Sequence, residues 1–366
     1  MLVATHWITG LALAAGAHQA APQPAVPIAD GARAAPGARV DHVVLISVDG
    51  LRSDALIAVP ADQLPGFTRL EQGAYTLNAR CDPDRSVTLP NHTAMVTGRP
   101  VLGAHGHAWL KNDDADEGET LHSNRGAYVA SMFDVAHDRG VRTATFAGKS
   151  KFAIYDVSFD AEHGAADEVA PDNGRDKLDE FVFAKKTPEI VDHVLRVLKD
   201  GGPRALVFAH FAVTDLTAHV NGWDVTPNSK YMRAVESVDA ELVRLLDAIE
   251  GDAKLARTTA IVLTADHGGG APLRSHDQAH MWVDYIIPFV VWTGASTAEP
   301  GHGVEHDLYA LNAGVRLDPG LKQPPMSAPG LPPIRNGDSG NLALALLGLP
   351  AIPGSTINGA QDLRAR

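Results

Sequence analysis

Carboxylate and imidazole side chains occur at three separated places in the chain and could together hold metal ions. Asp49 follows an apolar run, Asp215 precedes His219 by four positions, and Asp266 is adjacent to His267. A spacing of four is one helical turn, so Asp215 and His219 can face the same metal ion. A single aspartate after a strand often only caps a turn. Three aspartates and two histidines together favour a metal site. Mixed oxygen and nitrogen ligands suit zinc and also admit manganese.

A candidate nucleophile lies between these residues, in the segment RSVTLPNH at positions 85–92. Thr88 stands two residues before Pro90, and proline is favoured in the first turn of a helix. A hydroxyl at this position lies where backbone N–H groups and the helix dipole favour a phosphate. The alternative interpretation is that Thr88 only caps the helix.

These residues must be positioned by strands and helices, and the hydrophobic pattern predicts an α/β fold. Continuous apolar runs typical of buried parallel strands alternate with helical patterns. The strands are predicted at 43–48, 143–147, 205–211, 259–264 and 286–292, and helices at 187–198, 231–249 and 341–347. This alternation predicts a mostly parallel sheet with helices on both faces. Ligands of such sheets bind at the carboxyl ends of the strands, where Asp49, Asp215 and Asp266 fall.

The N-terminus predicts an exported protein with one folded domain. An apolar run ends in Ala15-Gly16-Ala17, so residues 1–17 are interpreted as a signal peptide, too short to span a bilayer. The alternative is an untranslocated tail, because neither Lys nor Arg precedes the run. Residues 18–39 are interpreted as a Pro- and Ala-rich linker, and 40–366 as a single folded domain. The expected location is periplasmic or extracellular.

Composition excludes some classes of function. The 366 residues carry a formal net charge of -13, which argues against a nucleic-acid-binding face. Apolar residues make up 45% of the chain, enough for a large core. The single cysteine, Cys81, cannot form an intramolecular disulfide. The sequence does not determine the oligomeric state.

Taken in order, the motifs resemble those of a known family. The sequence contains SVDG at 47–50, TLPNH at 88–92, Asp215 with His219, and ADHGG at 265–269. This set resembles the type I phosphodiesterase and nucleotide pyrophosphatase branch of the alkaline phosphatase superfamily, over roughly residues 43–358. The resemblance implies an alkaline phosphatase-like fold and hydrolysis of a phosphodiester or pyrophosphate bond in a nucleotide or small phosphate ester.

The resemblance also implies roles for individual residues. Thr88 would be the nucleophile that becomes transiently phosphorylated, and Asn91 would donate to a non-bridging phosphate oxygen. Two divalent ions, zinc or alternatively manganese, would lower the pKa of the threonine hydroxyl and stabilise the leaving oxygen. One metal would be held by Asp49, Thr88, Asp266 and His267, and the other by Asp215, His219 and a further histidine.

The further histidine is where the chain departs from the family pattern. Relatives carry it near the C-terminus, but residues 352–358 contain none. We expect His276 to replace it, because it lies in a polar segment where Asp277 could orient the ring. His280 adjoins Met281-Trp282 and is expected to pack instead. His302 and His306 are weaker candidates.

Three cations are candidate phosphate contacts. Lys149 and Lys151 follow a predicted strand, and Arg85 precedes Thr88. The alternative is that the two lysines lie in a solvated loop. If they point inward, they resemble the paired cations of superfamily monoesterases that use a threonine nucleophile.

Several functions therefore remain open. The favoured function is hydrolysis of a phosphodiester or pyrophosphate bond. The alternatives are a phosphate monoesterase, a phosphomutase and a non-catalytic binding protein. A sulfatase is disfavoured because the Cys/Ser-x-Pro-x-Arg context for formylglycine is missing around Thr88. We expect the leaving group to be recognised by loops within 101–142 and 160–175.

Overall fold

The computed structural model describes residues 40–200, 202–278, 280–294 and 306–365, which belong to one compact unit. The predicted signal peptide and linker, and His302, lie outside these residues. No helix within the described ranges is long and apolar enough to cross a membrane.

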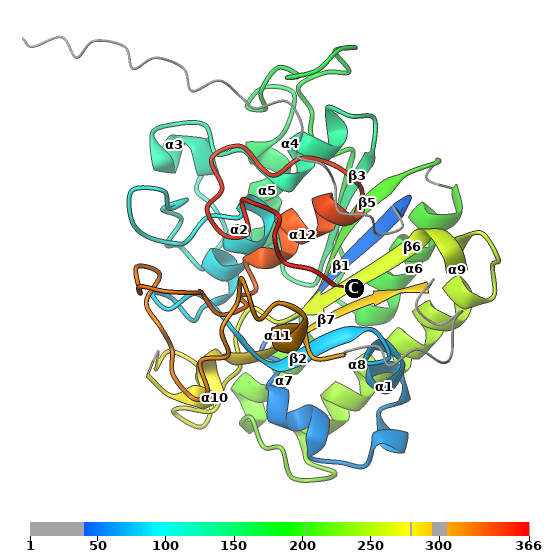
Figure 1. The fold of residues 1–366 in the computed structure, drawn as a ribbon, viewed down its shortest axis with the longest axis vertical. Helices are drawn as coiled ribbons and strands as arrows, with labels where there is room; N and C mark the ends of the chain where they lie inside the picture. The colour runs from blue at the N-terminus through cyan, green and yellow to red at the C-terminus, as the bar shows by residue number, and fades with distance from the viewer. Residues whose placement is uncertain (1–39, 201, 279, 295–305, 366) are drawn as a thin grey trace, which may run out of the picture. The chain divides into compact units, whose positions relative to one another are not determined.

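A seven-stranded sheet forms the centre of the fold, in the order β2-β7-β6-β1-β5-β3-β4 (Figure 1). Strands β6, β1, β5, β3 and β4 are parallel, and β7 runs antiparallel to both β6 and β2. The central strands β1, β5 and β6 are buried along their whole length, as expected for apolar runs covered on both faces. The strands are β1 His42–Val48, β2 Ala74–Arg80, β3 Arg142–Ala147, β4 Glu180–Phe183, β5 Ala205–Phe211, β6 Thr259–Thr264 and β7 Ile286–Thr293.

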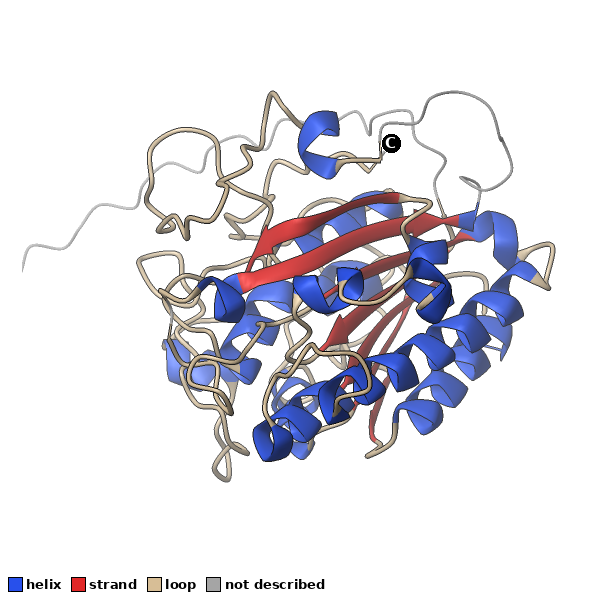
Figure 2. Ribbon diagram, turned by 90° about the horizontal axis from the view of Figure 1, so that it is seen from below, coloured by secondary structure: helices blue, strands red, loops and turns tan. Residues whose placement is uncertain are grey.

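Helices pack on both sides of this sheet (Figures 1 and 2). Helices α6 and α8 cover one face, and α2, α4 and α12 cover the other. Helix α8 buries a stripe of apolar residues spaced three or four apart, and each such side chain contributes about 1.5–3 kcal/mol by leaving water. The α-helices are α1 Pro65–Leu70, α2 Thr88–Thr97, α3 Leu121–Arg125, α4 Met132–His137, α5 Ala153–Ser158, α6 Thr187–Asp200, α7 Val213–Asn221, α8 Lys230–Glu250, α9 Leu255–Thr258, α10 Trp282–Tyr285, α11 Leu308–Leu311 and α12 Asp338–Leu346.

The predicted fold class is confirmed: the protein is α/β, with a mostly parallel sheet and helices on both faces. All five predicted strands and all three predicted helices are present, with ends shifted by a few residues. The sequence analysis missed the edge strands β2 and β4.

The order of the strands determines where the functional residues meet. Strand β1 lies between β5 and β6, with Val48 beside Phe211 and Ser47 beside Thr264. The three parallel strands therefore end at the same edge of the sheet. Asp49 follows β1, Asp215 lies in the first turns of α7 after β5, and Asp266 follows β6.

Candidate active site

The turn after β1 brings two aspartates together. Gly50 has a φ of +68°, and a Cβ at this position would lie 3.2 Å from Cβ of Asp215. The backbone N–H of Gly50 donates to Oδ1 of Asp266 at 3.0 Å. A glycine after Asp49 thus meets two requirements, a left-handed backbone and close approach of the neighbouring acidic side chains.

Helix α2 begins at Thr88, as the sequence predicts, but the N-cap residue is Val87. The threonine hydroxyl lies 3.4 Å from Nζ of Lys149. The carbonyl of Thr88 accepts from Nδ1 of His92 at 2.7 Å, and Oδ1 of Asn112 accepts from the N–H of Leu89 at 2.9 Å. The alternative role of Thr88 as a simple cap is not what this geometry shows, and the hydroxyl faces the site.

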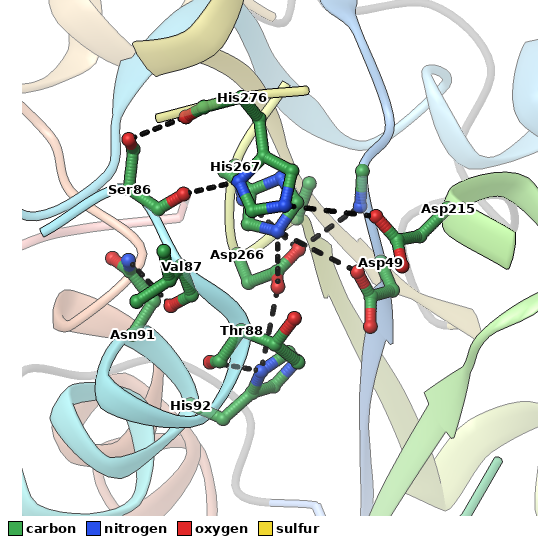
Figure 3. Close-up of polar contacts among 12 residues, drawn as sticks. Asp49, Ser86, Val87, Thr88, Asn91, His92, Asp215, Asp266, His267 and His276 are labelled. Atoms are coloured by element: carbon green, nitrogen blue, oxygen red, sulfur yellow. Dashed lines mark hydrogen bonds and ion pairs between the residues drawn. The ribbon is translucent and has the colours of Figure 1, made fainter. Parts of the chain in front are cut away.

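At this edge of the sheet, two fully buried groups of side chains have the composition and spacing of metal ligands. Asp49, Asp266 and His267 form one group, and Asp215, His267 and His276 form the other, each with ligand atoms within 4.8 Å of one another. Figure 3 shows both groups converging around His267. Oδ1 of Asp49, Oδ2 of Asp266 and Nε2 of His267 are buried without a hydrogen-bond partner among the described residues. Such atoms are costly unless a ligand satisfies them, so the donor set fits divalent metals.

Three histidines are oriented for coordination in the same way. Nδ1 of His219 contacts the Arg274 carbonyl at 3.0 Å, and Nδ1 of His267 contacts the Gly268 carbonyl at 2.8 Å. A carbonyl only accepts, so each Nδ1 carries a hydrogen, and in the neutral form of each ring Nε2 keeps a lone pair. Nε2 of His219 lies 3.2 Å from Oδ1 of Asp215, and Nε2 of His267 lies 3.1 Å from Oδ2 of Asp266. This arrangement is typical of metal-bound histidines.

His276 completes this set. Its Nδ1 contacts the Ser86 carbonyl at 2.5 Å, and its Nε2 lies 4.0 Å from Oδ1 of Asp215. Its ring is stacked on that of His267, with centroids 3.6 Å apart. The orienting group is therefore the Ser86 carbonyl, and Asp277, which we expected to serve, is exposed.

The other candidate histidines lie elsewhere. His280 is exposed, so the expected packing against Met281-Trp282 is wrong. Nδ1 of His306 contacts the Gly73 carbonyl at 2.9 Å, ahead of the edge strand β2. Among the described residues, the groups suited to a metal include His276 and neither His280 nor His306.

The electrostatics of the buried acids depend on their neighbours. Burial would raise the pKa of Asp49, but Lys149 and a hydrogen bond from His210 hold that pKa well below its usual range. Burial and the adjacent Asp49 raise the pKa of Asp266 well above its usual range. Burial also lowers the pKa of His267 to about 3, so its ring is neutral. Crowded carboxylates and neutral imidazoles form a site for cations.

Lys149 enters the site. Its Nζ lies 2.6 Å from Oδ2 of Asp49 and 2.7 Å from Oδ2 of Asp215, besides its contact with Thr88. Nζ of Lys151 donates to Oδ1 and the carbonyl of Asn112, at 2.8 and 2.9 Å. The alternative, that both lysines lie only in a solvated loop, is therefore not what the structure shows. Arg85, by contrast, is exposed.

The resemblance implies that Asn91 donates to a phosphate oxygen, whereas in the structure its side chain is bonded to the protein. Its Nδ2 donates to the carbonyls of Arg85 and Val87, and its Oδ1 accepts from the N–H of Asp82 and from Asn336. The side chain therefore holds the loop before Thr88 in place and points away from the two groups of candidate metal ligands (Figure 3). In this conformation it has no donor left for a phosphate oxygen.

Comparison with known proteins identifies the family of the chain. The family model of type I phosphodiesterase / nucleotide pyrophosphatase matches residues 43–287. The chain belongs to this family. Searching the curated proteins with the sequence gave no match.

Solved structures share the fold at low sequence identity. The C-terminal periplasmic domain of phosphoethanolamine transferase EptC from Campylobacter jejuni has a TM-score of 0.56 at 11% identity, over 90% of this chain and 96% of that chain. The zinc complex of the corresponding EcEptC domain from Escherichia coli has a TM-score of 0.52 at 13% identity, over 86% and 84%. An alkaline phosphatase superfamily protein from Vibrio parahaemolyticus has 0.53 at 13%, over 87% and 68%. These likenesses establish an alkaline phosphatase-like fold.

Proposed function

We propose that this family member hydrolyses phosphodiester or pyrophosphate bonds of small phosphate esters or nucleotides, with Thr88 as nucleophile at a centre for two divalent metals. The observation that carries the proposal is the set of buried, unpartnered ligand atoms on Asp49, Asp266 and His267 beside the threonine hydroxyl. The family match supports the reaction class.

The proposed ligands divide between two positions. Asp49, Thr88, Asp266 and His267 would hold one ion, and Asp215, His219 and His276 the other. Bound there, zinc or manganese would supply charge that favours the threonine alkoxide and offsets the negative charge of the phosphoryl group.

The residues of the chain define the remaining chemistry. Oγ1 of Thr88 forms a bond to phosphorus as the bond from phosphorus to the leaving oxygen breaks, and the proton of the hydroxyl is balanced by protonation of the leaving oxygen. Thr88 then carries the phosphoryl group, together with the second ester substituent when the substrate is a diester. Water then attacks this phosphorus and restores the hydroxyl. His92 holds the Thr88 carbonyl from one side, so the nucleophile is positioned before the substrate binds.

A monoesterase is the second candidate, because Lys149 reaches Thr88. A phosphate monoester carries one more negative charge than a diester, and a buried ammonium beside the nucleophile would stabilise it. Lys151, held by Asn112 nearby, would add to this effect.

Substrate preference can be measured with p-nitrophenyl phosphate and bis-p-nitrophenyl phosphate on the zinc-loaded enzyme. A higher kcat/KM for the diester supports the leading proposal, and the reverse supports the monoesterase. In a monoesterase, Lys149→Met should lower monoester turnover by about 100-fold and diester turnover much less. Arg85→Ala is the control, since this exposed cation should change neither rate. No turnover of either ester with bound metal would contradict both candidates.

We also propose that the chain is exported. The apolar segment before Gly16-Ala17 supports this, and two of the similar structures are periplasmic domains. Intact-mass measurement of the protein from the periplasm tests it, because cleavage after Ala17 would remove residues 1–17. Recovery of the uncleaved chain from the cytoplasm would contradict it.

A further inference from the structure

His210 lies beside Asp49 as a result of strand register. Ser47 of β1 is paired with His210 of β5, so the two side chains point to the same face of the sheet. Asp49 is two residues after Ser47, and successive residues of a strand alternate between faces. The backbone N–H of Asp49 also donates to the Phe211 carbonyl at 3.0 Å, which continues the pairing to this position.

The hydrogen bonds of His210 determine its tautomer. The N–H of Gly148 is shared between the His210 carbonyl at 3.1 Å and Nδ1 of His210 at 3.2 Å, so Nδ1 is an acceptor. Nε2 must then carry the hydrogen of the neutral ring, and it lies 2.8 Å from Oδ2 of Asp49. Both nitrogen atoms of His210 are thus used, and the bond to Asp49 has one direction.

The ring of His210 is also held in place by its neighbours. Phe152 is stacked on it, with centroids 4.2 Å apart and planes 29° apart. His92 packs edge-on at 4.9 Å, and His210 is fully buried. The hydrogen-bond donor is therefore rigid, as is needed to fix the orientation of a second side chain.

The two oxygens of Asp49 have different surroundings. Oδ2 accepts from His210 and lies 2.6 Å from Nζ of Lys149. Oδ1 has no hydrogen-bond partner among the described residues and lies 3.6 Å from Nε2 of His267. Oδ2 is therefore held by two neighbouring groups, and Oδ1 is available to a metal ion.

We propose that His210 is a positioning residue, which binds Oδ2 of Asp49 and thereby presents Oδ1 to the metal centre. The inference rests on the proposed function, since it requires metal at Asp49. It gives a role to a histidine that neither the family motifs nor the ligand groups contain.

The test compares two substitutions of similar length. His210→Met removes the donor, whereas His210→Gln keeps an N–H that can reach Asp49. His42→Met is the matched control, because His42 is a buried histidine at the opposite end of β1. Zinc stoichiometry and affinity are measured by competition with a chromophoric chelator, together with the melting temperature of the metal-free proteins.

We expect His210→Met to weaken one of the two zinc sites by about 10- to 100-fold. His210→Gln should recover most of that affinity, and His42→Met should bind zinc as the wild type does. If His210→Met does not fold, His210→Leu replaces it as the donor-free variant.

Two results would overturn the inference: wild-type zinc affinity in the donor-free variant, or equal weakening in that variant and in His210→Gln. If instead the wild-type protein binds no divalent metal, the proposed function itself fails. The zinc content of the wild type therefore separates the two failures.

Discussion

Thr88 begins α2 and leaves its hydroxyl facing Lys149 and the metal-ligand groups. Thr88→Ala removes the proposed nucleophile and only one of several proposed ligands, so we expect turnover to fall by at least about 10³-fold. Most of the bound metal and the melting temperature should be retained. Thr88→Ser keeps a hydroxyl and should retain measurable activity. Steady-state rates measured with metal content test this, and wild-type turnover by Thr88→Ala would exclude the residue from the chemistry.

His276 and His280 are four residues apart, and the structure buries the first and exposes the second. His276→Ala should cost one metal per chain and about 100-fold in rate, because it removes an imidazole oriented by the Ser86 carbonyl. His280→Ala changes an exposed side chain of the same loop. The metal content and the rate of this variant should each differ from wild type by no more than about twofold. Elemental analysis measures the metal content of both variants. Metal loss confined to His280→Ala would show that His280, and not His276, is the ligand.

The sequence alone suggested these residues as candidates, but it did not predict the groups that they contact. The spacing of Asp215 and His219 is local, and one helical turn relates them whatever the fold. The contact of His276 with the Ser86 carbonyl spans 190 positions, and no local pattern encodes it. The same holds for His210, whose position beside Asp49 depends on the register of two strands. For Asn91, the motif suggests a side chain facing substrate, whereas the structure shows it bonded to the loop before Thr88.

Between β6 and β7, one segment carries His267 and His276 and is anchored by Asp284. The carboxylate of Asp284 accepts from the N–H groups of Ala271 and Gln278, at 3.2 and 3.1 Å. Asp284→Ala leaves two backbone donors without this acceptor, and each such loss costs about 1–3 kcal/mol when buried. We expect a lower melting temperature and weaker binding of one metal.

Asp277→Ala is the control for that variant, because Asp277 is exposed on the same loop. Thermal unfolding and zinc titration of the pair check the expectation. Equal behaviour of the two variants would show that Asp284 does not anchor the loop.

The strands differ in how clearly the sequence predicts them. Strands β1, β3, β5, β6 and β7 could be predicted because continuous apolar runs are required where both faces of a sheet are covered. Strand β2, with sequence AYTLNAR, is an edge strand that mixes polar and apolar residues, and β4 has only four residues. Such short or half-exposed strands lack a distinctive period.

At the scale of the whole molecule, removal of metal should lower stability as well as activity. The proposed ligands lie on separate elements, namely the turn after β1, helices α2 and α7, and the segment after β6. Dialysis against a chelator should abolish activity and lower the melting temperature, since buried carboxylates on separate elements lose their shared cations. Adding zinc or manganese should restore both. Calorimetry with and without chelator tests this, and an identical melting curve with full activity in excess chelator would contradict the two-metal proposal.

The position of β1 in the middle of the sheet has a consequence for biosynthesis. Strand β1 is His42–Val48, but its two neighbours, β5 and β6, begin at Ala205 and Thr259. At about 5–20 residues per second, a ribosome needs on the order of 10–30 s to reach β5 after completing β1. Throughout that interval a strand that the finished fold buries along its whole length has neither of its hydrogen-bonding partners. The nascent chain should therefore depend on a holding chaperone early in synthesis, well before any metal is bound.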